Sequence, residues 1–341
     1  MNTTTASIQS NITFIRTLDG LRLTMAVLGI LVYVAGFLGN LLSLLVFIQK
    51  EFRQGSTSLI FLLLNIFSTI HLVSLSIEFL DSIFQVQIIA SSIFRCQFTL
   101  WLQNTTRSVC AFLAATISID RFIRSEYPMR SRIWCTTTNV LKAFYVFLTF
   151  SIVFYLFFYH PANVFDSEGQ CSFPYDEKFR LYALNIMPPL RFVLVCFLPT
   201  ILMVSCGIRM LFNIQQSKQR TVQPMAITTV NPPSKGSNTT EETRRKIARI
   251  DTMLVLMVLA NVVAYGITQL PFNIYTLYYG YETSDDFSFY ALLRAFLLMW
   301  SSIYFGIGFY LYCIASAQFR KQFIMKLTQI CRPQPQPPLR S

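Results

Sequence analysis

Seven long apolar blocks constrain the fold of this chain more than any other feature of its sequence. Polar or charged residues separate the blocks, which cover residues 23–48, 57–80, 93–123, 139–160, 181–212, 250–279 and 288–313. A helix needs roughly 20 predominantly apolar residues to cross the ~30 Å hydrocarbon core of a bilayer. The blocks therefore predict an all-α membrane protein, a bundle of seven transmembrane helices.

The composition excludes a water-soluble fold, because 53% of the 341 residues are hydrophobic and only 13% are charged. That charged fraction is about half the value typical of a soluble domain. The formal net charge of +12 would point to nucleic acid in a soluble protein. In a membrane protein it must instead be assigned loop by loop, and we expect no nucleic-acid partner.

The distribution of basic residues predicts the orientation in the membrane. Cations gather in alternate loops and after the last block, at positions 50, 53, 124, 130, 132, 218, 220, 235, 244–246, 249, 320, 321 and 326. Positively charged loops remain in the cytoplasm, so the opposite loops and the N-terminus are expected outside the cell. Two glycosylation sequons, at Asn2 and Asn11, agree with an extracellular N-terminus. We expect a multi-pass protein of the plasma membrane.

The chain divides into three parts by composition. Residues 1–22 are predicted to form an extracellular N-terminus, 23–313 the seven-helix domain, and 314–341 an amphipathic helix and cytoplasmic tail. Within the domain, residues 214–243 are rich in Ser, Thr, Pro and Gln and are expected to form a disordered third cytoplasmic loop. Phe319, Phe323 and Leu327 have the spacing of a surface helix. Cys331 at its end is a candidate for palmitoylation, with an unmodified thiol as the alternative.

The third block joins two features at a fixed separation. It starts at Cys96 and ends in Asp120-Arg121-Phe122, and a helix of this length spans the bilayer from one interface to the other. This arrangement resembles the rhodopsin-like (class A) G-protein-coupled receptors, whose third helix begins with a disulfide cysteine and ends in an Asp-Arg-Tyr triplet. Gly39-Asn40, Pro199, Pro271 and Tyr312 follow in the family's order.

The stretch from Gly308 to Tyr312 resembles the variant of invertebrate FMRFamide-type neuropeptide receptors. Other positions depart from the family. Thr69 stands in place of the usual helix-two aspartate, Gln269 in place of the helix-six tryptophan, and Gly308 in place of the helix-seven asparagine. Without the helix-two aspartate we expect no sodium site. With Gln269 in place of the tryptophan, the conformational step beneath the ligand is expected to differ from that of the family.

The resemblance implies a disulfide between Cys96 and Cys171, both on the oxidising side of the membrane. It also implies a cytoplasmic switch formed by Asp120, Arg121, Asp251 and Tyr312. Asp251 precedes Pro271 by 20 residues, which places it ~30 Å along helix six, level with Arg121. The alternative is that Arg121 is one more cytoplasmic cation and Asp251 is solvated.

Polar side chains in the outer half of the bundle are the candidate ligand site, because exposing them to lipid is costly. These are Glu78, Gln103, Arg107, Arg191, Gln269 and Arg294. Two of them have an alternative structural role. Arg107 could form an ion pair with Glu78, and Arg294 could extend toward the outer interface.

The candidate site excludes several ligand classes. No carboxylate lies between Cys96 and Asp120 to bind an amine, and block seven has no lysine to bind retinal. Arginines and amides suit a peptide or a small anion, so the sequence predicts a neuropeptide receptor, with a metabolite or lipid receptor as the alternative. A transporter or channel would need ionisable groups along a continuous path, whereas here they cluster at the two ends.

The sequence does not predict an enzyme. Its two histidines, His71 and His160, lie on different predicted helices and form neither a catalytic triad nor a metal cluster. His71 is expected to be a hydrogen-bonded interior residue. No cofactor or metal is predicted. The expected partners are a heterotrimeric G protein, membrane lipids, and an arrestin and receptor kinase acting on the third cytoplasmic loop.

Overall fold

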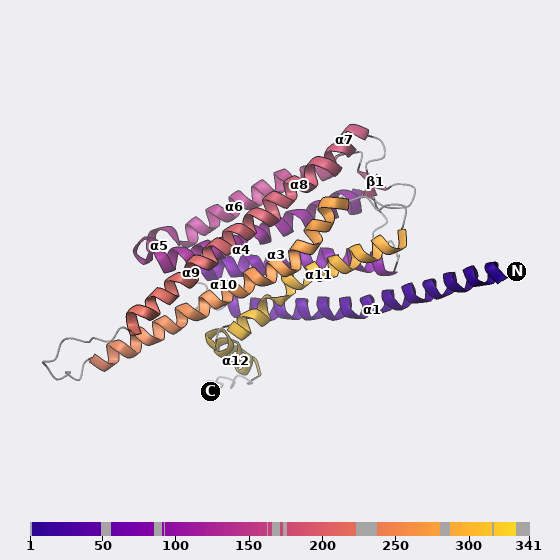
Figure 1. Ribbon diagram of the computed structural model, residues 1–341. Helices are drawn as coiled ribbons and strands as arrows, with labels where there is room; N and C mark the ends of the chain where they lie inside the picture. Colours follow the sequence, from indigo (N-terminus) through magenta and orange to yellow (C-terminus); the bar gives the residue numbers. More distant parts are fainter. Residues whose placement is uncertain are drawn as a thin grey trace, which may run out of the picture.

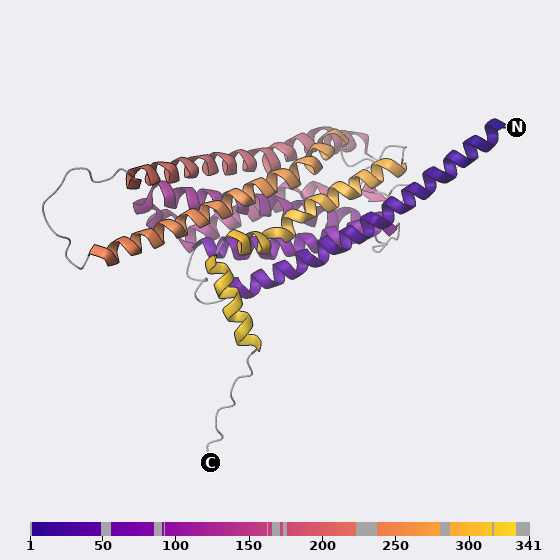
Figure 2. The same cartoon turned by 60° about the horizontal axis from the view of Figure 1, so that its bottom comes forward.

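The computed structural model shows a bundle of long helices that lie side by side (Figure 1). The structure describes residues 2–48, 56–84, 91, 93–161, 163–165, 171–172, 176–222, 237–279, 287–315 and 317–331. Turning the bundle shows α1 projecting beyond its neighbours at the N-terminal end and α12 leaving the bundle at a steep angle (Figure 2). The expected all-α bundle is confirmed.

The first four spans come from the N-terminal half of the chain. They are α1 (Asn2–Phe47), α3 (Ser56–Phe84), η1 (Ile93–Thr99) continuing as α4 (Leu100–Glu126), and α6 (Thr137–Phe154) continuing as η2 (Leu156–Tyr159). The short helix α5 (Pro128–Trp134) joins the third span to the fourth. Its first residue is a proline, which fits the first turn of a helix because no backbone N–H is needed there.

A two-stranded hairpin precedes the fifth span. Strand β1 (Val164–Phe165) pairs antiparallel with β2 (Cys171–Ser172), with Phe165 opposite Cys171. The fifth span is a continuous series of α7 (Glu177–Leu181), η3 (Tyr182–Ile186), α8 (Met187–Arg191), η4 (Phe192–Phe197) and α9 (Leu198–Val222). Helices α10 (Ser237–Tyr279) and α11 (Phe287–Ala315) complete the bundle, and α12 (Ala317–Cys331) follows.

Helix α4 occupies the centre of the bundle, where it packs against α3, α6, α9 and α10. Within the described ranges, five helical stretches combine the length and hydropathy of a membrane span: 19–47, 56–81, 137–159, 177–213 and 292–314. The spans that contain α4 and α10 are absent from this set. In α4 a polar run that includes Gln103, Asn104 and Arg107 lowers the mean hydropathy. Because other helices surround α4, it can carry polar residues that a lipid-facing helix could not.

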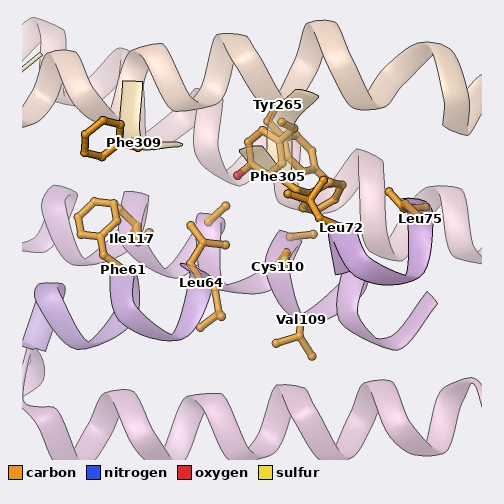
Figure 3. Close-up of a cluster of buried hydrophobic side chains, with 14 of the residues drawn as sticks. Phe61, Leu64, Leu72, Leu75, Val109, Cys110, Ile117, Tyr265, Phe305 and Phe309 are labelled. Carbon is orange, nitrogen blue, oxygen red and sulfur yellow. The ribbon is translucent and has the colours of Figure 1, made fainter. Parts of the chain in front are cut away.

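The core consists of apolar side chains contributed by several spans (Figure 3). Leu72 of α3, Cys110 and Ile117 of α4, and Phe305 of α11 are almost completely buried. The outward faces of the peripheral helices are also apolar, and Leu23 and Val146 are 69% and 65% exposed. Apolar residues on both faces are expected where the core is buried in protein and the outside is covered by lipid tails.

Two segments are more helical than the sequence predicted. Helix α1 already begins at Asn2, within the predicted N-terminal region 1–22, because neither Pro nor Gly occurs before Gly20 to interrupt it. The predicted disordered loop 214–243 is shorter, since α9 extends to Val222 and α10 begins at Ser237. Residues 214–222 contain Gln, Lys and Arg, and residues 237–243 contain Glu, all of which are good helix formers. Residues 223–236 lie outside the described part of the chain.

The predicted surface helix is present as α12. Phe319 is buried, Phe323 packs against the core, and Leu327 remains 48% exposed. The ring centroid of Phe319 lies 5.6 Å from that of Phe47 in α1 and 5.9 Å from that of Phe309 in α11. Aromatic packing therefore holds the start of α12 against the ends of α1 and α11.

Helices α1 and α11 approach so closely that only glycine fits at their crossing. A Cβ atom added to Gly306 would lie 2.5 Å from the Gly36 Cα, and one added to Gly36 would lie 3.2 Å from the Gly306 Cα. Small residues allow helix backbones to meet within a membrane, where packing drives association. The Tyr310 hydroxyl donates to the Ala35 carbonyl at 3.0 Å, which supports the same crossing.

We predict that Gly306→Ala separates α1 from α11 and destabilises the detergent-solubilised protein by roughly 1–3 kcal/mol, as overpacking does elsewhere. The measurement is the melting temperature. Gly266→Ala on α10 is the matched control, because nothing lies within 4 Å of the added Cβ. The control should be neutral or slightly stabilising. Equal melting temperatures for the two variants would contradict the close crossing.

Candidate ligand site and cytoplasmic network

The outer end of the third span is tied to the β-hairpin by a disulfide and an asparagine. Cys96 and Cys171 are bonded, with their Cα atoms 5.3 Å apart, as the family resemblance implied. The buried Asn163 amide donates to the Cys96 carbonyl at 2.6 Å and to the Phe158 carbonyl at 3.0 Å. These contacts fix the hairpin over the end of the bundle where the candidate ligand residues lie.

Two ion pairs cross between spans near this outer end. Arg294 Nη2 of α11 lies 2.8 Å from Glu78 Oε1 of α3, and Arg95 Nη1 of η1 lies 3.0 Å from Asp81 Oδ2 of α3. The first pair joins two candidate ligand residues, a pairing that the sequence analysis did not propose. The sequence analysis missed the second pair, although the three-residue spacing of Glu78 and Asp81 puts both on one helix face.

Two buried arginines converge deeper in the bundle, on the ring of Phe272 in α10. The guanidinium carbon of Arg107 in α4 lies 4.3 Å from the ring centroid, and that of Arg191 in α8 lies 5.8 Å from it. Arg107 is 5% exposed and Arg191 is 4% exposed. Arg191 also donates to the Asn273 Oδ1 at 3.3 Å. Three spans thus meet at one cationic and aromatic centre.

The two cations repel each other, which makes their joint burial informative. Both distances to the same ring place the guanidinium carbons at most about 10 Å apart. Like charges at that separation repel by at least about 1.5 kcal/mol at an effective dielectric constant of ~20. Contact with the Phe272 ring compensates for part of this cost. A negatively charged or strongly dipolar ligand group placed between them would lower this repulsion.

Local backbone geometry brings Arg191 into the bundle. Pro188 and Pro189 lie in α8, and π-helical turns occur on both sides, in η3 and η4. Proline lacks the N–H of a regular helical hydrogen bond, so a continuous α-helix is disfavoured here. The wider turns change the direction in which the following side chains point, and such turns are frequent at functional sites.

The two glutamines of the candidate site bind backbone carbonyls of neighbouring helices. Gln103 Nε2 donates to the Ser74 carbonyl at 3.1 Å, and Gln269 Nε2 donates to the Ser301 carbonyl at 2.8 Å. Gln269 Oε1 is buried without a hydrogen-bond partner in the part of the chain that is described. Gln269 thus supplies a polar contact between α10 and α11.

His71 has the interior role that the sequence predicted. Its Nδ1 lies 2.9 Å from the Thr106 Oγ1, and its ring centroid lies 4.2 Å from that of Phe305.

The predicted ligand residues form two layers. Glu78 and Arg294 make the outer layer, and the deeper layer consists of Gln103, Arg107, Arg191 and Gln269. Sequence reasoning missed Phe272 and Asn273, although Asn273 follows Gln269 by four residues and shares its helix face.

A second polar network lies at the C-terminal end of α4, around the Asp120 carboxylate, at the end that the sequence predicts to be cytoplasmic. Asp120 Oδ2 accepts from Thr57 Oγ1 at 2.6 Å and from Arg124 Nε at 3.0 Å, and Oδ1 accepts from Ser56 Oγ at 3.3 Å. Ser56 and Thr57 begin α3, so this network joins two spans. The role of Arg124 was not predicted, although its four-residue spacing from Asp120 is that of a helical ion pair.

The other predicted switch residues are placed as follows. Arg121 is half-buried at the end of α4, while the Asp251 side chain lies outside the described residues, so their pairing stays a prediction. Tyr312 is buried, with its ring centroid 4.9 Å from that of Phe61 and 5.8 Å from that of Phe319. The side chains of Asn2, Asn11 and Cys331 also lie outside the described part.

The Glu78–Arg294 pair should contribute to the stability of the bundle. Its side chains are 15% and 31% exposed, so water screens the interaction only partly. We predict that Glu78→Gln and Arg294→Gln each lower the melting temperature and that the double variant loses less than their sum. A coupling of at least about 0.5 kcal/mol is expected for groups in contact. Additive losses would contradict the pair.

Comparison with known proteins agrees with this arrangement. The sequence model of the family described as 7 transmembrane receptor (rhodopsin family) matches residues 39–304. Galanin receptor 2b of Danio rerio is 24% identical over 299 residues, covering 86% of this chain and 72% of that protein. A probable G-protein coupled receptor of Caenorhabditis elegans is 21% identical over 312 residues, covering 85% of this chain and 66% of that protein.

The matched family region includes the disulfide cysteines, the central arginines, the Asp120 network and most of the seven spans. It covers well over half of the 341 residues. Enzymatic function is excluded, because the family and both relatives are receptors. This chain belongs to the rhodopsin family of seven-transmembrane receptors.

Proposed function

We propose that this receptor binds an extracellular peptide in the outer half of its bundle and activates a heterotrimeric G protein at the cytoplasmic end. The convergence of Arg107, Arg191 and Phe272 carries the proposal, because three spans meet there with both charge and aromatic surface. Arginine donors suit peptide carbonyls and carboxylates, and the Phe272 ring offers contact to an apolar side chain.

Two further observations support a peptide over other ligands. The outer layer of Glu78 and Arg294, between the deep site and the hairpin, offers both an acceptor and donors to an extended chain. A relative that is named as a galanin receptor matches most of the chain, which supports a peptide-type ligand. The proposed ligand would thus contact the outer pair first and place one end beside the two deep arginines.

A small anionic metabolite or lipid is the second candidate. The observation that favours it is the burial of two arginines beside one ring, since a single carboxylate or phosphate placed between them would neutralise their repulsion. Such a ligand would need only the deeper layer. Glu78 and Arg294 would then be purely structural, whereas a peptide would contact both layers.

The proposed output is a change at the cytoplasmic ends of α4 and α10. Arg121 and Asp251 are proposed to pair across these ends in the resting receptor and to separate when ligand binds, as a two-state equilibrium. The deep site adjoins the helices that would move, because Phe272 and Gln269 belong to α10 and Arg107 to α4. Ligand contacts there would change the relative stability of the two states.

The proposal predicts that a peptide from a random library raises a second messenger in cells that express this receptor. Arg191→Gln should then raise the half-maximal concentration about tenfold or more, the loss expected for a buried charge-assisted contact. Lys142→Gln is the matched control, because Lys142 is exposed on α6. Its response should be unchanged.

The library experiment also decides between the two ligand classes. Responses to small carboxylates or fatty acids, without responses to peptides, would replace the peptide proposal with the anionic one. A peptide response that Arg191→Gln leaves intact, at equal surface expression, would refute the deep arginine site. A receptor that responds to peptide without any G-protein signal would refute the proposed output.

A further inference from the structure

We propose that Arg124 is a positioning residue that clamps the cytoplasmic ends of α3, α4 and α5 together and thereby keeps the receptor in its resting state. The part of this inference that concerns activation rests on the proposed G-protein function. The clamp itself rests on contacts alone. Its members are Arg124, Asp120, Ser56, Thr57 and Cys135, and we call them the Arg124 clamp.

One guanidinium group connects three segments of the chain. Arg124 Nε donates to Asp120 Oδ2 at 3.0 Å, and Nη2 donates to Ser56 Oγ at 2.7 Å and to the Cys135 carbonyl at 3.3 Å. These acceptors belong to α4, to the first turn of α3 and to the residue that ends α5. The planar fork of arginine can hold several acceptors at once, whereas a lysine ammonium binds as a point charge.

The Asp120 carboxylate makes Arg124 necessary. The Asp120 side chain is only 4% exposed, so its charge is largely removed from water. The partners described for its two oxygens are the hydroxyls of Ser56 and Thr57 and the guanidinium of Arg124. Among these partners Arg124 is the one that carries a charge, so its loss would leave the two hydroxyls as the remaining ones. A buried carboxylate in that state favours any rearrangement that hydrates it or brings another cation to it.

The geometry of α4 separates the clamp from Arg121. Residues four apart lie on the same helix face, so Asp120 and Arg124 face α3 together. Adjacent residues do not face each other, so Arg121 projects from α4 in a different direction from Asp120. The clamp is therefore an additional device beside the proposed Arg121–Asp251 pair, and each can be changed without altering the other's side chains.

The clamp also sets the position of α5. The Cys135 carbonyl accepts from Arg124, its backbone N–H donates to the Ser131 carbonyl at 2.9 Å, and its thiol lies 3.9 Å from the Asp120 carbonyl oxygen. Helix α5 carries the exposed side chains Met129 and Ile133. Releasing Arg124 would free the end of α5 and change how these side chains are presented at the cytoplasmic face.

Cys135 provides a direct reporter of the clamp. Burial and the nearby Asp120 carboxylate raise the pKa of the Cys135 thiol to about 11, although Arg124 and Arg121 act to lower it. The thiolate is the reactive form, so the clamped thiol should react slowly with a maleimide at neutral pH. Loss of the Arg124 charge without any opening would therefore slow labelling, so that faster labelling reports opening. Opening of the clamp exposes the thiol and lowers its pKa toward the ordinary value. The labelling rate of Cys135 therefore measures clamp opening without any reference to signalling.

The test compares Arg124→Gln and Arg124→Lys with Arg132→Gln, a matched control that removes an exposed cation from the neighbouring helix α5. Membrane-permeable maleimide is applied to intact cells, and labelling in the Cys135→Ser background is subtracted. Arg124→Gln should accelerate Cys135 labelling about tenfold, the factor expected for a lost charge-assisted contact. Arg124→Lys, which keeps the charge but loses the planar guanidinium, should give an intermediate rate. Arg132→Gln should leave the labelling rate unchanged.

Ligand-free second-messenger signalling, normalised to surface receptor, is the second readout. Arg124→Gln should raise it several-fold and Arg132→Gln should not. An unchanged labelling rate in both Arg124 variants would overturn the clamp, whatever the signalling result. Faster labelling with unchanged ligand-free signalling, in a receptor that still responds to an agonist, would overturn its role in activation.

The same pair of readouts separates the clamp from the proposed function. A receptor without any G-protein signal would refute the proposed function, while faster Cys135 labelling would still support the clamp. If Arg124→Gln does not reach the cell surface, Thr57→Val provides the second variant, because it removes the 2.6 Å hydrogen bond to Asp120 and leaves Arg124 in place. It should accelerate labelling less than Arg124→Lys, and an unchanged rate would count against the network.

Discussion

The burial of charge within a membrane bundle is the constraint on which the rest of this structure depends. A charged side chain facing lipid costs several kcal/mol, so it must meet protein partners or water. Helix α4 carries such side chains at two depths, Arg107 in the outer half and Asp120, Arg121 and Arg124 at the cytoplasmic end. Its position between α3, α6, α9 and α10 follows from that content, since only a surrounded helix can hold it.

The two polar regions of α4 use different chemistry. Near the N-terminal end of α4, Arg107 lies with Arg191 beside one aromatic ring, an arrangement of cations and aromatic surface. Near its C-terminal end, the Asp120 carboxylate accepts hydrogen bonds from hydroxyl and guanidinium donors. One helix therefore carries both polar regions and connects them mechanically.

The sequence predicted the helical bundle, because that depends on hydrophobic length, and the family resemblance implied the disulfide, which the structure contains. The candidate ligand residues stay a prediction. The sequence did not predict which charged groups meet. Glu78 pairs with Arg294, a contact that depends on helix rotation and tilt and hence on packing, including the contact of Gly36 with Gly306. Arg124 was missed since the neighbouring Arg121 carries the family motif. The helical extension of α1 to Asn2 was missed because polar residues can be helical where nothing interrupts them.

The central claim is that α4 joins an outward-facing recognition site to an inward-facing cytoplasmic network. Cysteines introduced at the exposed positions Lys178, beside the hairpin, and Arg132, in α5, test it most directly. On intact cells an impermeant maleimide should label Lys178→Cys but not Arg132→Cys, and permeabilisation should make both reactive. Labelling of both positions before permeabilisation would place the two ends of α4 on the same side of the membrane and contradict the account.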